Sequence, residues 1–130
     1  MAEHDLTGMW SGIYNYPHSH PPCAFEAQLR DVAGSLVGEI TETEALLFPA
    51  PTQLSAMIRG LRRASAVRFT KFYDIDSDQY RPVLYDGILS TDGNEIAGQW
   101  SIPGAWSGSF IMIRAGGRAV AEEREAAASA

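Results

Sequence analysis

The sequence predicts an all-β protein in which eight antiparallel strands, connected as an up-and-down meander, close into a barrel. Eight short segments alternate apolar and polar side chains with the period of a β-strand. No helical segment of any length separates them, and the 12 Gly and 7 Pro residues are spread along the chain as turn residues. An eight-stranded meander can remove its exposed edges by closing on itself. An open sandwich of two sheets is the alternative.

The first predicted strand, residues 9–16, has one aromatic face. Trp10, Gly12, Tyr14 and Tyr16 alternate with polar and smaller residues, so they point to the same side. The glycines on either side of Trp10, Gly8 and Gly12, are expected to leave room for its large ring at a strongly bent place. The remaining chain is organised around this strand.

Seven further strands are predicted from the same alternation: 24–30, 35–41, 53–61, 65–73, 83–90, 95–102 and 107–114. The strand at 65–73 carries apolar residues on both faces. We expect Val67, Phe69, Lys71 and Tyr73 to point inward, and the opposite register is the alternative. That register decides whether Lys71 is buried or an ordinary surface lysine.

The connections predict which end of the barrel is open. In a meander, successive connections alternate between the two ends. The second, fourth and sixth are short turns at 31–34, 62–64 and 91–94, whereas the first, third and fifth are longer, at 17–23, 42–52 and 74–82. The long connections therefore collect at one end, which we expect to be the mouth, and the short turns form the floor.

The domain organisation follows from the change of composition after Arg114. Residues 1–114 are predicted to form a single β-barrel domain. Residues 115–130 are rich in Ala and Glu after a pair of glycines, which predicts a flexible tail or a short helix.

Composition excludes several classes of function. The net charge of −6 argues against non-specific nucleic-acid binding, which needs a basic surface. Cys23 is the one cysteine, so no disulfide forms within the chain. The first residues lack the basic and apolar regions of a signal peptide, and no apolar run has the length of a membrane span. These features predict a cytoplasmic protein with neither nucleic acid nor membrane as its partner.

The barrel interior is the candidate ligand-binding site. A closed eight-stranded barrel either fills with side chains or holds one small ligand. If Lys71 points inward, its buried ammonium needs a carboxylate or a bound anion as partner. Aromatic walls with polar tips suit a small, partly apolar molecule, whereas the bland alternative is that the same side chains simply fill the barrel. The candidate lining residues are Tyr14, Tyr16, Lys71, Tyr73, Tyr85 and Trp100, with Phe48 and Trp106 as gates at the mouth.

Metal binding is not expected. His18, His20 and Cys23 stand close together at the mouth, but a structural zinc site needs a fourth ligand and the chain has no other cysteine. The acidic segment 74–78 resembles the opening of a calcium loop but lacks the required glycine and bidentate glutamate. Whether the protein uses a cofactor is left open by the sequence.

Two further functions stay open at this stage. No catalytic motif is visible, so an enzyme would have to assemble its site across strands, for example from Tyr73, Lys71 and Asp86. A filled barrel could instead serve as an interaction module through the apolar segment 46–51 or an exposed strand, and a homodimer is compatible with this. The arginines near the floor are either an anion site or a solvated charged face; they are Arg59, Arg62, Arg63 and Arg68.

Gly8, Trp10 and Arg114 resemble the signature of the calycins, which include lipocalins, fatty-acid-binding proteins and avidins. In those proteins a Gly-x-Trp tryptophan packs at the closed end of an eight-stranded barrel, beneath a basic residue of the last strand. The resemblance implies a ligand-binding barrel over about residues 6–114, in which a guanidinium over an indole gains cation–π attraction.

Within the calycins, segments 6–10 and 95–100 look most similar to avidin-type barrels. Biotin binding is not inferred, because the polar residues that bind the ligand in that family are not matched to positions of this sequence. The Gly-x-Trp-x-Gly pattern of residues 8–12 is also similar to the nitrobindins, which bind haem. Their iron ligand is a histidine near the C-terminus, whereas His4, His18 and His20 are all near the N-terminus, which argues against haem.

Overall fold

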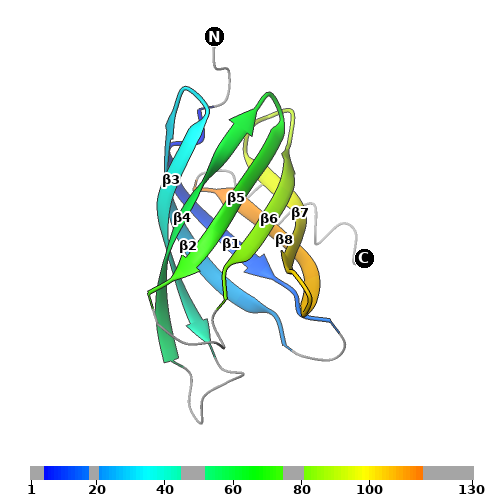
Figure 1. Cartoon of the computed structure of the whole chain (residues 1–130). Coiled ribbons are helices and arrows are strands. Elements are labelled where there is room, and N and C mark those ends of the chain that lie inside the picture. Colours follow the sequence, from blue (N-terminus) through cyan, green and yellow to red (C-terminus); the bar gives the residue numbers. More distant parts are fainter. Residues whose placement is uncertain (1–4, 18–20, 45–51, 75–80, 116–130) are drawn as a thin grey trace, which may run out of the picture.

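A computed structural model of the chain shows one closed barrel of eight antiparallel strands (Figure 1). The structure describes residues 5–17, 21–44, 52–74 and 81–115. Each strand pairs with its neighbours in sequence, and the first strand also pairs with the last, with Trp10 opposite Arg114 and Tyr14 opposite Phe110. This closure confirms the predicted up-and-down barrel and excludes the open sandwich. The strands are β1 (Gly8–Tyr14), β2 (Cys23–Val32), β3 (Ser35–Glu44), β4 (Thr52–Arg63), β5 (Ala66–Tyr73), β6 (Val83–Leu89), β7 (Glu95–Ile102) and β8 (Trp106–Arg114).

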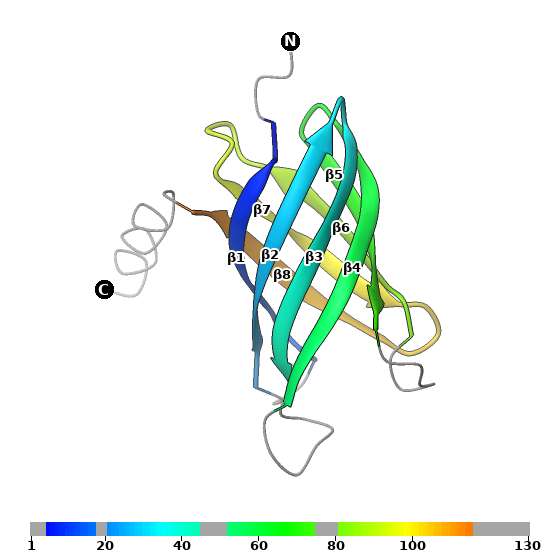
Figure 2. The same cartoon turned by 90° about the vertical axis from the view of Figure 1, so that its left-hand side faces the viewer.

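The two ends of the barrel differ as the connection lengths predict. The hairpins β2–β3, β4–β5 and β6–β7 turn at the end where β1 begins and β8 ends, at the top of Figure 1, which we name the closed end. The opposite end receives the longer connections after β1, β3 and β5, and we name it the open end. Figure 2 shows the strands crossing the barrel obliquely between these ends.

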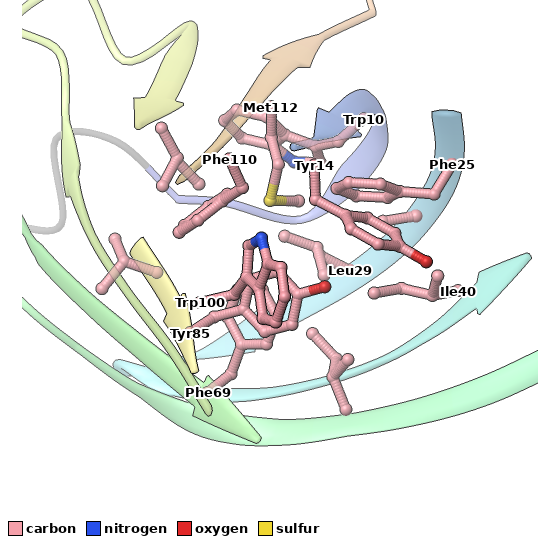
Figure 3. Close-up of a cluster of buried hydrophobic side chains, with 14 of the residues drawn as sticks. Trp10, Tyr14, Phe25, Leu29, Ile40, Phe69, Tyr85, Trp100, Phe110 and Met112 are labelled. Carbon is pink, nitrogen blue, oxygen red and sulfur yellow. The ribbon is translucent and has the colours of Figure 1, made fainter. Parts of the chain in front are cut away.

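Strong alternation explains why these segments are strands. In β2 every second residue is buried, including Phe25, Ala27 and Leu29, while the residues between them face solvent. The inward-facing side chains of all eight strands form a single core, shown in part in Figure 3. Trp10 lies fully buried in this core, at the closed end.

Several predicted strand limits were wrong. The first strand ends at Tyr14, so Tyr16 follows it; the strand predicted at 35–41 continues to Glu44; and β8 begins at Trp106, one residue before its predicted start. The turn predicted at 31–34 is tighter, because Asp31 is still paired with Leu36.

The predicted reason for one glycine was also wrong. A side chain at Gly12 would collide with the ring of Phe25, so the space left by Gly12 accommodates that ring on β2 and not Trp10. Gly8 has a φ of +136°, a conformation that favours glycine, at the point where the chain enters β1.

Candidate ligand-binding site

Lys71 on β5 points into the barrel, which confirms the expected register of this strand. Its side chain is 1% exposed, and its Nζ lies 2.9 Å from Oε2 of Glu42 on β3, whose side chain is fully buried. Either charge would be costly to bury alone, and each supplies the counter-charge that the other needs. The partner expected for Lys71 is thus a carboxylate of the same chain.

Tyrosine hydroxyls complete the surroundings of the Glu42 carboxylate. The hydroxyls of Tyr14 on β1 and Tyr73 on β5 both donate to Oε1 of Glu42, the first at 2.9 Å. The hydroxyl of Tyr16 in turn donates to the hydroxyl of Tyr14 at 3.2 Å. A hydrogen-bonded chain therefore runs from the half-buried Tyr16 to the buried ion pair, and hydrogen bonds to a charged group are the stronger kind.

Three tyrosine rings surround the Lys71 ammonium. Its Nζ lies 4.6 Å from the ring centroid of Tyr14, 4.7 Å from that of Tyr73 and 5.3 Å from that of Tyr85. A cation this close to a ring is attracted to its π face, and more strongly where water is excluded. We name Tyr14, Glu42, Lys71, Tyr73 and Tyr85 the interior polar cluster.

The electrostatics of the interior polar cluster favour a charged lysine among neutral tyrosines. Burial opposes charge on Lys71, but Tyr85, Glu42 and Tyr73 outweigh it and raise the pKa of the ammonium well above its usual value. Burial raises the pKa of the Tyr14 hydroxyl, and the charge of Glu42 raises it further. Burial also raises the pKa of Tyr73 and of Tyr85, although Lys71 opposes both shifts. The tyrosines therefore remain proton donors at neutral pH.

An aromatic group adjoins the interior polar cluster toward the open end. The ring centroids of Tyr16 and Trp106 lie 5.2 Å apart, and those of Trp100 and Trp106 lie 6.0 Å apart at right angles. Trp100 also contacts Tyr14 edge-on at 6.0 Å, which joins the two groups. Trp100 is buried, whereas Tyr16 and Trp106 are only partly buried. We name Tyr16, Trp100 and Trp106 the aromatic rim.

Backbone contacts hold the aromatic rim in place. The indole Nε1 of Trp100 donates to the carbonyl of Asn15 at 2.9 Å, which ties β7 to the residue that follows β1. Tyr85, Trp100 and Tyr14 point into the same interior space from three different strands (Figure 3). The result is a set of flat apolar walls beside hydroxyl groups, which suits a small molecule with both apolar and hydrogen-bonding parts.

The structure places seven of the eight candidate ligand-binding residues, six lining residues and two gates, in one connected group. Phe48 lies outside the described residues. The other seven contact one another through rings or hydroxyls; they are Tyr14, Tyr16, Lys71, Tyr73, Tyr85, Trp100 and Trp106.

Glu42 is the site residue that sequence reasoning missed. The sequence predicts position 42 at the start of the third connection, but in the structure it is the next inward position of β3 after Leu36, Gly38 and Ile40. Two signals could have found it: that alternation continues to Glu42, and an inward-pointing Lys71 requires a buried carboxylate.

The residues of the calycin-like signature meet at the closed end. The Arg114 guanidinium lies 4.6 Å from the centre of a Trp10 ring, and it donates to the carbonyls of Gly93 and Asp5. The Trp10 indole donates to the carbonyl of Leu6 at 2.9 Å. These contacts fasten the last strand and the segment before β1 across the closed end.

The other candidate chemistries receive less support. Asp86 lies on the outer surface, where it pairs with Arg68 at 3.2 Å, so the trial set of Tyr73, Lys71 and Asp86 is not brought together. The Cys23 thiol is buried and donates to the carbonyl of Thr43. His18, His20 and residues 75–78 lie outside the described residues. Within the described ranges, no group of three or more His, Cys, Asp or Glu side chains is arranged to hold a metal ion.

Comparison with known proteins leaves the family of this chain undetermined. No protein-family model and no curated protein sequence matches it. In the part of the chain that the structure describes, no helix has the length and apolar character needed to cross a membrane.

Proposed function

We propose that the barrel binds a small, partly apolar molecule at its open end, against the interior polar cluster and the aromatic rim. The observation that carries this proposal is the fully buried pair of Lys71 and Glu42, held by tyrosine side chains. Apolar residues of similar volume would stabilise a barrel at least as well as a buried ion pair, so stability alone is a weak reason for the pair.

The charges favour an uncharged ligand. Lys71 and Glu42 neutralise each other, and a charged molecule beside them would be buried without a partner of its own. An uncharged ring system can instead pack on Trp100 and Trp106 and exchange hydrogen bonds with tyrosine hydroxyls. We therefore expect a neutral molecule with an aromatic or alicyclic body and one or two hydrogen-bonding groups.

The calycin resemblance supports the same proposal. The packing of Trp10 under Arg114 at the closed end is the arrangement that the resemblance implies for a ligand-binding barrel. From this resemblance we infer the binding of a small molecule and no other property. A cytoplasmic location, the absence of nucleic-acid and membrane partners, and a homodimer remain predictions of the sequence.

Native mass spectrometry of the purified protein is the first test. A ligand carried through purification would add mass that disappears on denaturation. The second measurement is the fluorescence of N-phenyl-1-naphthylamine, a neutral aromatic probe, during titration with the protein. We expect Trp106→Ala to weaken probe binding about tenfold, through the loss of a ring contact.

Ile13→Ala is the matched control, because Ile13 is a large apolar residue exposed on the outer face of β1. It should leave probe binding unchanged. A bare native mass together with no probe binding would overturn the proposal, and so would equal losses in the two variants.

A further inference from the structure

The outer face of β4, β5 and β6 is unusually apolar. Among the described residues, nine large apolar side chains are exposed, and five of these belong to these three strands. They are Met57, Leu61, Phe72, Leu84 and Ile88. Single exposed apolar residues need no explanation, but several gathered on adjacent strands indicate a contact surface.

A groove with a volume of about 910 Å³ crosses the same face. The strand registers arrange its lining in rows: Arg59 lies opposite Thr70, which lies opposite Leu84, and Leu61 lies opposite Arg68. Arg63 adjoins the groove at its closed-end side. Apolar and cationic side chains therefore lie beside one another in the groove.

The charge of the groove is opposite to that of the protein. Three arginines line it, Arg59, Arg63 and Arg68, against the single carboxylate of Asp86, while the whole chain carries a net charge of −6. The pair of Arg68 and Asp86 is a surface pair, with side chains 77% and 59% exposed, and such pairs hold their members weakly. The guanidinium groups can thus turn to an incoming carboxylate, which they bind in a bidentate manner.

We propose that this outer face is a docking surface for a segment of a partner protein that carries acidic side chains beside apolar ones. Arginine, methionine and aromatic residues are the types enriched where proteins meet. The apolar surface extends beyond the groove to Met57, Phe72 and Ile88, further than a small molecule in the groove would cover.

Charge also favours an acidic partner over a second copy of the chain. A symmetric dimer through this face would bring Arg59, Arg63 and Arg68 toward their own copies, and like charges across an interface cost affinity. The docking surface faces away from the proposed ligand site, because its exposed apolar and arginine side chains point outward, whereas Lys71 and Tyr85 of β5 and β6 are buried in the interior.

Two-dimensional NMR of the ¹⁵N-labelled protein tests the proposal. The probe is a synthetic twelve-residue peptide of glutamate and leucine, and the same peptide with lysine for glutamate is its charge control. We expect the acidic peptide to shift amide signals of β4, β5 and β6, and the basic peptide to leave them in place. NMR detects binding even at millimolar dissociation constants, so no shift with the acidic peptide overturns the proposal.

Matched variants locate the effect. Arg59→Glu removes a groove arginine, and Arg30→Glu makes the same change of net charge at an exposed position of β2. We expect Arg59→Glu to weaken the acidic peptide about tenfold and Arg30→Glu to have little effect.

Equal effects of Arg59→Glu and Arg30→Glu would show attraction by overall charge and overturn the proposal. A dimer in native mass spectrometry that Arg59→Glu dissociates would assign the face to a second copy. Binding to anionic phospholipid vesicles without any response to the peptide would assign it to a membrane. Failure of the neutral-probe titration leaves this test unaffected, because the two sites lie on opposite sides of the sheet.

Discussion

The two ends of the barrel each contain an ion pair with a buried carboxylate, and the two pairs are built differently. At the closed end, Nε of Arg62 lies 2.7 Å from Oδ2 of Asp31. Toward the open end, Lys71 and Glu42 lie 2.9 Å apart. Each pair joins a carboxylate on β2 or β3 to a cationic side chain on β4 or β5. The question is which of the two pairs serves the fold and which serves the candidate site.

The surroundings of the carboxylates answer this question. Asp31 accepts hydrogen bonds from the backbone amides of Leu6, at 3.1 Å, and Gly34, at 2.8 Å, so it fixes the path of the chain at two places. Glu42 is held by the side chains of Tyr14 and Tyr73 instead. Side chains can rearrange around a ligand at a smaller cost than backbone, so the second pair is the one suited to recognition.

The largest effect is expected from breaking the pair at the open end. Lys71→Met keeps most of the side-chain volume but leaves the Glu42 carboxylate buried without its counter-charge. We expect a loss of about 3–5 kcal/mol in the free energy of unfolding, measured by urea denaturation.

The double variant Glu42→Gln/Lys71→Met is the control. The amide oxygen introduced at position 42 still accepts hydrogen bonds from the hydroxyls of Tyr14 and Tyr73. Because no buried charge remains, most of the lost free energy of unfolding should return. A double variant as unstable as the single one would contradict this account, because the cost would then lie in packing.

A smaller effect is expected at the closed end, with a different dependence on pH. Burial raises the pKa of Asp31, but the bonds from Arg62 and from the backbone amides of Leu6 and Gly34 outweigh it and lower this pKa below its ordinary value. The resulting stability is present above the unfolded pKa of about 3.9 and is lost as the pH falls through the folded pKa. We expect Asp31→Asn to cost about 2–3 kcal/mol at neutral pH.

The difference between the wild type and Asp31→Asn should therefore shrink as the pH falls below about 4. Urea denaturation of both proteins across this range measures it. Subtraction removes the contribution of the other carboxylates, which both proteins share. A difference that stays constant with pH would falsify the assignment of this stability to the Asp31 charge.

The sequence predicts the features of this molecule that depend on local patterns, and it does not predict those that depend on partners across the barrel. Strand alternation and turn residues indicate the number of strands, their order and the open end, because these depend on local patterns along the chain. The alternation allows the inward register of Lys71 but also the opposite one, because both faces of β5 carry apolar residues. Strand ends are harder to place. The alternation of β2 and β3 continues to Asp31 and Glu42, but a charged residue stays at an inward position only if it has a partner elsewhere in the barrel.

Only part of the candidate site can be predicted from the sequence, for the same reason. Its aromatic residues and Lys71 stand out as unusual on an inward face, whereas the identity of the carboxylate depends on which strands lie across the barrel. Glu42 is 29 positions from Lys71 in the chain, and the two strands are not neighbours in the sheet. A requirement for a counter-charge can be predicted from one strand, but its source cannot.

The smallest expected effect sharpens the comparison at the closed end. The turn between β2 and β3 consists of Ala33 and Gly34, with φ values of 53° and 91°. Two-residue turns with two positive φ values favour Asn-Gly, since an alanine is strained in this region. We expect Ala33→Asn to raise the free energy of unfolding by about 0.5–1 kcal/mol, measured by urea denaturation.

Ala33→Val should act in the opposite direction, because a β-branched residue tolerates a positive φ poorly. Neither substitution should alter binding of the neutral probe, since the turn that Asp31 caps lies at the opposite end from the aromatic rim. A change in probe affinity with Ala33→Asn would show that the two ends are coupled through the strands, and the division into a structural end and a recognition end would then fail. A gain in stability with unchanged probe affinity would establish that the closed end can be tuned separately.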